Sequence, residues 1–235
     1  LADDMSLEMD YVYSGSRNEK VIAGNINLTY DSASGVNYPF GDRSRRVDSV
    51  WGPVSMTPYS GLSDYHGLQS VFTKRFSDDW QLSANYTLST LKNADPLPMS
   101  GLSEVTFNVA RDLGDEYTYA ATDQRHRAVV NGIWQVGGGF QVSGLYFYGS
   151  GERRQTNAGD DLRDTGGDNS ERLRPDGTIV PRNAFVGTSI HRIDMRLQQR
   201  IPIGGISADA MLEVFNALNR ANYGDFDTDM MSASY

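Results

Sequence analysis

The chain has 235 residues, no cysteine and a formal net charge of -9, so its length suffices for one large β domain. The missing cysteines exclude disulfides and thiolate metal sites, and the acidic balance argues against nucleic acid as a partner, because phosphate backbones attract clustered Lys and Arg. No run of 18 apolar residues occurs, so no helix is expected to cross a bilayer.

Seven segments alternate between apolar and polar residues with the period of a β-strand. The clearest runs from Trp80 to Ser89, where every even-numbered residue is apolar or aromatic and every odd-numbered residue is polar. Each segment is long enough to cross the hydrocarbon core as a tilted strand, which takes about 9–11 residues. The seven predicted strands cover residues 5–13, 65–76, 80–89, 127–136, 140–150, 190–201 and 206–217.

The connections between these segments fall into two classes. Residues 77–79, 137–139 and 204–205 form short turns, whereas residues 14–64, 91–124 and 151–187 form long polar loops. Loops longer than about 15 residues are uncommon in compact soluble domains, but outer-membrane barrels combine short periplasmic turns with long outer loops. The sequence therefore predicts an all-β fold, a partial antiparallel transmembrane β-barrel in the bacterial outer membrane.

Strand direction follows from the same alternation of turns. The segment that begins at Trp80 leaves a short turn, so it runs outward, and the first strand must also run outward. Residues 47–57 are strand-like but cannot be another full span, and we expect them to pair above the membrane.

The two faces of the predicted strands differ in chemistry, so each is assigned an environment. Apolar residues face lipid and polar residues face the lumen in such barrels. The lipid-facing candidates are Trp80, Leu82, Tyr86, Leu88, Trp134, Tyr146 and Tyr148, and the lumen-facing candidates are Arg75, Arg127, Arg192, Asp194, Arg196, Arg200, Asp209 and Glu213. The charges of the last two strands are expected to pair across their hairpin. Such a ladder is either a docking surface or polar substrate path, or simply a solvated barrel interior with routine ion pairs.

Little in the sequence points to catalysis or to a bound cofactor. His66, His126 and His191 have no partner at metal-ligand spacing. They are either ligand contacts near the barrel mouth or interfacial residues that bond to their neighbours. The acidic loop 151–187 could bind calcium, although its interleaved arginines could neutralise the acids instead. No catalytic triad or carboxylate pair can be argued from the spacings, so we expect neither an enzyme nor a cofactor.

Four stretches resemble the barrels of TonB-dependent outer-membrane receptors, especially the Oar-like branch. They read SDYHGLQSVFTKRFSDDWQLSANYTLS, DQRHRAVVNGIWQV, GTSIHRIDMRLQQRIPI and LEVFNALNRANYG. Phe215, Asn216 and Asn219 match the F-N-x-x-N pattern of that family, and Asn222, Tyr223 and Gly224 match the N-[FY]-G that follows.

The resemblance implies a 22-stranded barrel filled by an N-terminal plug, which imports a scarce nutrient with energy from the TonB complex. Neither a plug nor a TonB box is visible here, and no terminal aromatic strand follows. We therefore interpret residues 1–235 as the C-terminal part of one receptor barrel, with outer-membrane lipid, a plug, the rest of the barrel, TonB and an unknown nutrient as partners. The alternatives are a passive porin or structural barrel, and a soluble β-rich carbohydrate-binding protein.

Overall fold

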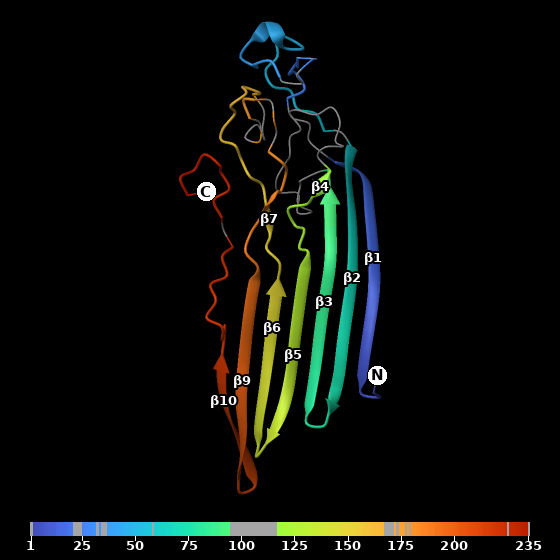
Figure 1. The fold of residues 1–235 in the computed structure, drawn as a ribbon, viewed down its shortest axis with the longest axis vertical. Coiled ribbons are helices and arrows are strands. Elements are labelled where there is room, and N and C mark those ends of the chain that lie inside the picture. The colour runs from blue at the N-terminus through green and yellow to red at the C-terminus, as the bar shows by residue number, and fades with distance from the viewer. Residues whose placement is uncertain are drawn as a thin grey trace.

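The fold is one broad antiparallel sheet whose neighbouring strands follow chain order (Figure 1). The computed structural model describes residues 2–20, 25–31, 33, 37–57, 59–94, 117–166, 172, 174–176, 178, 180–224 and 226–234. The seven long strands are β1 Met5–Lys20, β2 Tyr59–Ser77, β3 Trp80–Asn93, β5 His126–Gly137, β6 Phe140–Gly149, β9 Ile190–Ile203 and β10 Ile206–Val214. The short β4 (Thr118–Tyr119) pairs with β3, while β7 (Arg153–Arg154) and β8 (Phe185–Val186) form a separate pair. Within the described residues, no helix has the length and hydropathy needed to cross a membrane.

All seven predicted strands are present, and their directions alternate as the parity argument requires. Figure 1 places the short turns at one end of the sheet and the long connections at the other. The turn between β5 and β6 uses Gly137, Gly138 and Gly139, all with positive φ. The β2–β3 turn has no glycine, and Asp78 and Asp79 adopt φ of 48° and 68° there. Both turns supply the left-handed backbone that tight hairpins need.

The expectations about the outer connections hold only in part. Residues 47–57 are not another span and do pair beyond the strands, where Val54 accepts the Ile26 N–H at 2.8 Å and Val47 donates to the Asn27 carbonyl at 3.1 Å. They form no strand, however, and only Met56 makes an isolated bridge. Their backbone is held by the side chain of Asn27, whose amide donates to the carbonyls of Asp48 and Trp51 at 3.0 and 3.1 Å and whose oxygen accepts the N–H of Asp48 at 2.7 Å. The last strand ends at Val214, three residues earlier than predicted.

Register across the sheet separates the residues into two faces. One row joins Trp80, Trp134, Val142, Leu197 and Leu212 across five strands. The adjacent row on the other face joins Gln81, Ile133, Ser143, Arg196 and Glu213. The first row is wholly apolar and the second is mainly polar, as the alternation in sequence predicts.

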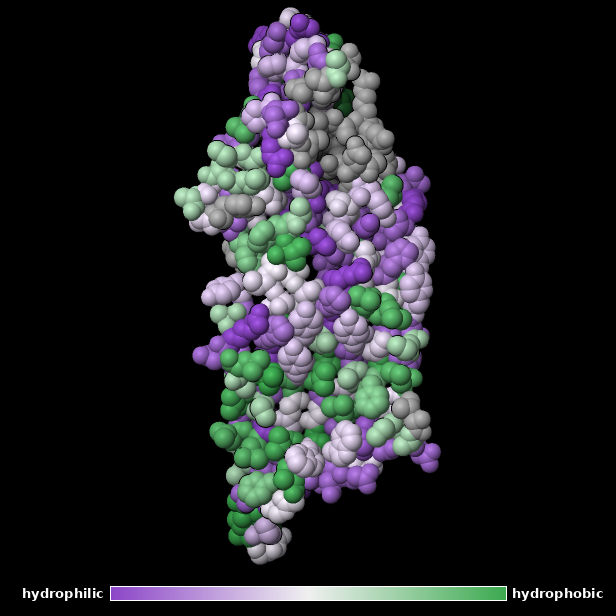
Figure 2. Space-filling view, in the orientation of Figure 1, coloured by the Kyte–Doolittle hydropathy of each residue, from purple (hydrophilic) through white to green (hydrophobic). Residues whose placement is uncertain are grey.

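The spanning part of the sheet has no protein core of its own. Among the described residues, the buried apolar side chains lie near or beyond the outer strand ends: Leu28, Phe40, Ala94, Ala120, Ala158 and Val180. A band of hydrophobic residues instead lies open across the lower half of the sheet (Figure 2). The sheet does not close, because β1 pairs only with β2 and β10 only with β9. An apolar face of this size needs an apolar environment to cover it.

Candidate functional site

The strongest charge cluster of the sheet lies on the hairpin of β9 and β10. Arg196 donates from Nε and Nη2 to Glu213 Oε1 at 2.8 and 2.6 Å. Arg200 donates from Nε to Asp209 Oδ1 at 2.9 Å and from Nη2 to Asp209 Oδ2 at 3.1 Å. Both pairs follow from the register, which sets each arginine opposite its acid. The expected pairing across this hairpin is thus present, and because these side chains stay largely exposed, the pairs set the charge of the face more than its stability.

Arg192 is paired differently, along its own strand. Its guanidinium contacts Asp194 at 2.8 Å, because the ladder between β10 and β9 stops at Val214 and Met195. Asp194 also accepts the backbone N–H of Asn216 at 2.9 Å. The acid therefore ties the arginine to the segment that leaves β10.

That segment contains the asparagine pattern noted in the sequence. Asn216 and Asn219 have φ of 50° and 48°, a backbone region that asparagine tolerates better than most residues. Further on, the Asn222 side chain makes the two hydrogen bonds to His191 that a neighbouring strand would make. Its Oδ1 accepts the His191 N–H and its Nδ2 donates to the His191 carbonyl, both at 3.0 Å. Asn216 and Asn219 therefore turn the chain away from β9. Asn222 then pairs with the backbone N–H and carbonyl of His191, which β10 no longer reaches.

The other two charged candidates lie apart from this hairpin. Arg127 stands over the ring of Phe147 with its guanidinium carbon 5.8 Å from the ring centre. Arg75 lies beside the β2–β3 turn and donates to the carbonyl of Asp3. Strand alternation and register place all eight charged candidates on one face and the seven apolar candidates on the other. Which face meets lipid stays a prediction.

The three histidines lie on the apolar face, each bonded to a tyrosine of a neighbouring strand. The Tyr Oη to His Nδ1 distances are 2.6 Å for Tyr11–His66, 2.8 Å for Tyr86–His126 and 2.9 Å for Tyr146–His191. These contacts match the interpretation as interfacial residues bonded to neighbours. In the described part of the chain, no three metal-ligating side chains come together.

A lysine on the same face was missed by sequence reasoning. Lys74 pairs in register with Met5 and Leu82, yet its ammonium turns back toward the short turn. It lies 3.0 Å from Asp4 Oδ2 and 4.3 Å from the centre of the Trp80 ring, and the side chain is buried. The sequence did contain a signal: Lys74 has the same parity as the apolar residues of its strand, so it had to lie on their face. The contacts show a lysine that directs its charge away from the apolar band.

Comparison with known families decides which kind of protein this is. The profile of the family described as "Outer membrane beta barrel domain" matches residues 1–179. The chain belongs to this outer-membrane barrel family. Among solved structures, the outer membrane transporter YddB from Escherichia coli matches with a TM-score of 0.49 and 11% identity, over 94% of this chain and 27% of that one. The chain thus spans just over a quarter of that transporter, and no curated protein matches.

Family membership places this barrel chain in the bacterial outer membrane. Its long connections form a joined layer beyond the strands. Phe40 donates its backbone N–H to the Asp164 carbonyl at 2.7 Å, and Gly41 donates to Asp164 Oδ2 at 2.8 Å. Near β4, Tyr117 donates to Asp64 Oδ2 at 2.8 Å. Segments that follow different strands therefore support one another.

This outer layer of the barrel chain contains one half-buried and one buried arginine. Arg153 pairs with the buried Asp123 at 2.9 Å and stacks 3.7 Å from the centre of the Tyr119 ring. Arg163 is only 7% exposed, and its three guanidinium nitrogens have no hydrogen-bond partner among the residues that the structure describes. Burial lowers the pKa of Arg163, because removal from water disfavours the charged form.

Two described acids of loop 151–187, Asp161 and Asp176, act as turn caps. Asp161 accepts the backbone N–H groups of Thr165 and Gly166 at 2.9 and 3.0 Å. Asp176 accepts the N–H and hydroxyl of Thr178, and the pKa of Asp176 is lowered first by that hydroxyl. Asp168 lies outside the described residues. Backbone and hydroxyl donors of the loop itself thus bind both carboxylates.

Proposed function

We propose that this chain forms part of the wall and the substrate-capturing outer loops of a TonB-dependent active transporter. The observation that carries the proposal is the chemistry of the sheet: seven spanning strands in one open meander, with a charged face opposite an apolar face. An eight-stranded barrel is narrow enough for side chains to fill, whereas wide barrels enclose a polar lumen. A wall that leaves both edge strands unpaired needs further strands to close, and its charged face suits a wide lumen.

In this proposal the apolar face meets lipid and the charged face lines the lumen. The Arg196–Glu213 and Arg200–Asp209 pairs present both charge signs side by side, which suits contact with a polar plug or with a hydrated substrate. The joined outer layer captures the nutrient first. Movement of the plug, driven through TonB, then opens the lumen, because an unplugged wide barrel would leak.

The test uses the native, full-length polypeptide extracted from membranes. Peptide mapping upstream of Leu1 should find a plug-like domain and a TonB box, and the purified protein should bind the periplasmic domain of TonB. In planar bilayers it should show little standing conductance.

The passive alternative gives the opposite results. High constant conductance, with no plug sequence and no TonB binding, would identify a porin and overturn the proposal of active transport. A chain recovered in the aqueous fraction would contradict both membrane roles.

A further inference from the structure

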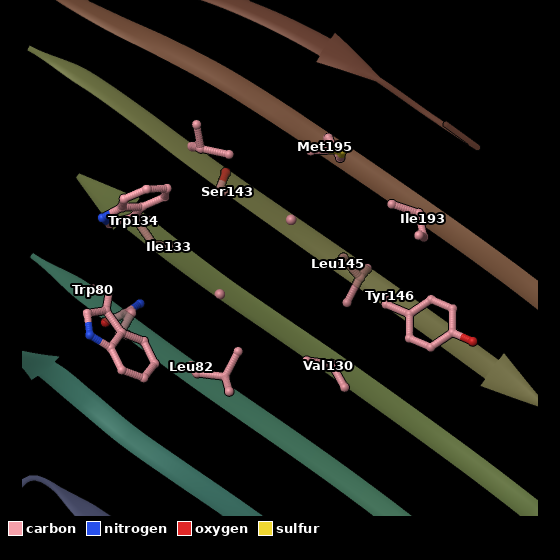
Figure 3. Close-up of a pocket in the computed structure, with 14 residues that line it drawn as sticks. Trp80, Leu82, Val130, Ile133, Trp134, Ser143, Leu145, Tyr146, Ile193 and Met195 are labelled. Atoms are coloured by element: carbon pink, nitrogen blue, oxygen red, sulfur yellow. The ribbon is translucent and has the colours of Figure 1, made fainter. Parts of the chain in front are cut away.

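The outer layer contains a buried positive charge whose hydrogen-bonding groups are unused. Arg163 is 7% exposed, and its Nε, Nη1 and Nη2 bond to no group within the described part of the chain. By contrast, the residues that line the hollow on the apolar face, across β3, β5, β6 and β9, carry no charge (Figure 3). The group that calls for a charged ligand therefore lies beyond the strands.

Arg163 lies at a seam between two long connections. Its carbonyl accepts a hydrogen bond from Asn37 Nδ2 at 3.0 Å, and the Thr165 carbonyl accepts one from Asn25 Nδ2 at 2.9 Å. Asn25 and Asn37 belong to the connection between β1 and β2, whereas Arg163 and Thr165 belong to the connection between β6 and β9. These bonds fix the backbone at the seam and leave the guanidinium free to bind something else.

The neighbouring acid Asp161 serves the backbone and not the guanidinium. Asp161 accepts the N–H groups of Thr165 and Gly166 at 2.9 and 3.0 Å. Its charge acts on Arg163, but no hydrogen bond joins the two side chains. A buried charge is costly unless it is paired and hydrogen-bonded, and arginine keeps its proton at neutral pH. In the described ranges, the seam thus holds a cation that lacks a hydrogen-bonded counter-ion.

We propose that Arg163 binds the oxyanion, a carboxylate or phosphate group, of a small hydroxylated molecule captured by the outer layer. The planar guanidinium matches either group through two parallel N–H bonds, and such bonds are stronger in a buried site than in water. Asn37 supplies a second contact, because its Oδ1 is also buried and unbonded in the part of the chain that is described. That oxygen can accept a hydrogen bond from a ligand hydroxyl, so a hydroxy acid or a sugar phosphate fits the seam. Capture of such a ligand for import rests on the proposed transporter function, whereas binding of the anion does not.

The experiment follows amide hydrogen exchange of the full-length protein in detergent. Inorganic phosphate or citrate is added at an ionic strength held constant with chloride. The reporters are the amides of Phe40 and Gly41, which donate to the carbonyl and Oδ2 of Asp164, next to Arg163 in the chain. We expect phosphate and citrate to slow both amides at least fivefold, with saturation, because a ligand that binds the closed seam stabilises it. Chloride alone should slow neither.

Arg163→Met removes the charge and keeps a side chain of similar bulk. Without phosphate or citrate, its exchange should be equal to or slower than that of the wild type, since an unpaired buried charge is lost. Added anion should then have no effect. Arg153→Met is the matched control, because Arg153 is paired with Asp123 at 2.9 Å in the same layer, and it should keep the anion response. If Arg163→Met does not fold, Arg163→Lys should raise the half-saturating anion concentration at least threefold, because lysine cannot form the two parallel bonds.

Four results would overturn the site. Neither anion slows exchange in the wild type, or Arg163→Met responds as the wild type does. Faster exchange of Arg163→Met in anion-free buffer would mean that the guanidinium already has a partner in the full-length protein. Protection by lipopolysaccharide but by neither soluble anion would assign Arg163 to a lipid phosphate and refute the captured small molecule. TonB binding is measured separately, so its absence would withdraw active transport and leave the anion site standing.

Discussion

Placing one arginine on each face of β3 tests which face meets lipid. Ala84 and Asn85 are neighbours in the middle of this strand and point to opposite faces. Ala84 lies four residues beyond Trp80, about 10 Å into an apolar band about 25 Å tall, so it is close to the midplane. An arginine on the lipid face costs about 2–4 kcal/mol at the midplane and about 0–1 near the boundaries.

Ala84→Arg should therefore lower the free energy of unfolding by about 3 kcal/mol, which is roughly a hundredfold in the folding constant. Asn85→Arg should cost far less, because its side chain would reach the hydrated lumen. Leu88→Arg should cost about 1 kcal/mol, since it lies on the lipid face but nearer the outer boundary. These values come from guanidinium unfolding of the full-length protein in phospholipid vesicles. Equal losses for Ala84→Arg and Asn85→Arg would refute the assignment of faces.

Three further predictions concern the charged face, the asparagine segment and the outer layer. Glu213→Ala should change the free energy of unfolding by less than about 1 kcal/mol, because its pair with Arg196 is exposed; a loss above 2 kcal/mol would assign the pair a structural role. Asn222→Ala removes both hydrogen bonds to the His191 backbone and should cost about 1–3 kcal/mol, with faster hydrogen exchange of the His191 amide; unchanged exchange would contradict the strand-replacing contact. Burial first, and then a hydrogen bond to a β2 carboxylate, raises the pKa of Tyr117 to about 12. Its contribution to stability should therefore be complete below pH of about 10 and lost as pH rises through 12, seen as a late tyrosinate absorbance that Tyr117→Phe removes.

The strands were predictable because a side chain's face in a strand depends only on its parity. The alternation through Trp80–Ser89 needs no knowledge of its neighbours, and short turns fix the register of the β2–β3, β5–β6 and β9–β10 hairpins. Register across the long loops is not encoded locally. The Tyr11–His66, Tyr86–His126 and Tyr146–His191 contacts cross those pairings, so the sequence indicated interfacial histidines but not their partners.

The outer loops were less predictable because side chains there replace backbone pairing. Val50 and Val54 alternate as a strand would, but the amide of Asn27 takes the backbone groups of the segment, and Val50 stays 88% exposed. Likewise, the last strand ends just before Asn216, which has a φ of 50° and donates its N–H to Asp194.

The sheet and the outer layer are stabilised by different means, and this difference bears on function. The spanning strands rely on backbone pairing and on an apolar environment outside the protein. The outer layer instead buries Leu28, Phe40 and Val180, and Asp164 joins two of its segments by accepting the backbone N–H groups of Phe40 and Gly41. A layer with its own small core can hold a fixed surface beyond the strands. In the proposed transporter, its loops can therefore change sequence, and with it the ligand that they bind, without disturbing the strands that hold the chain in the membrane.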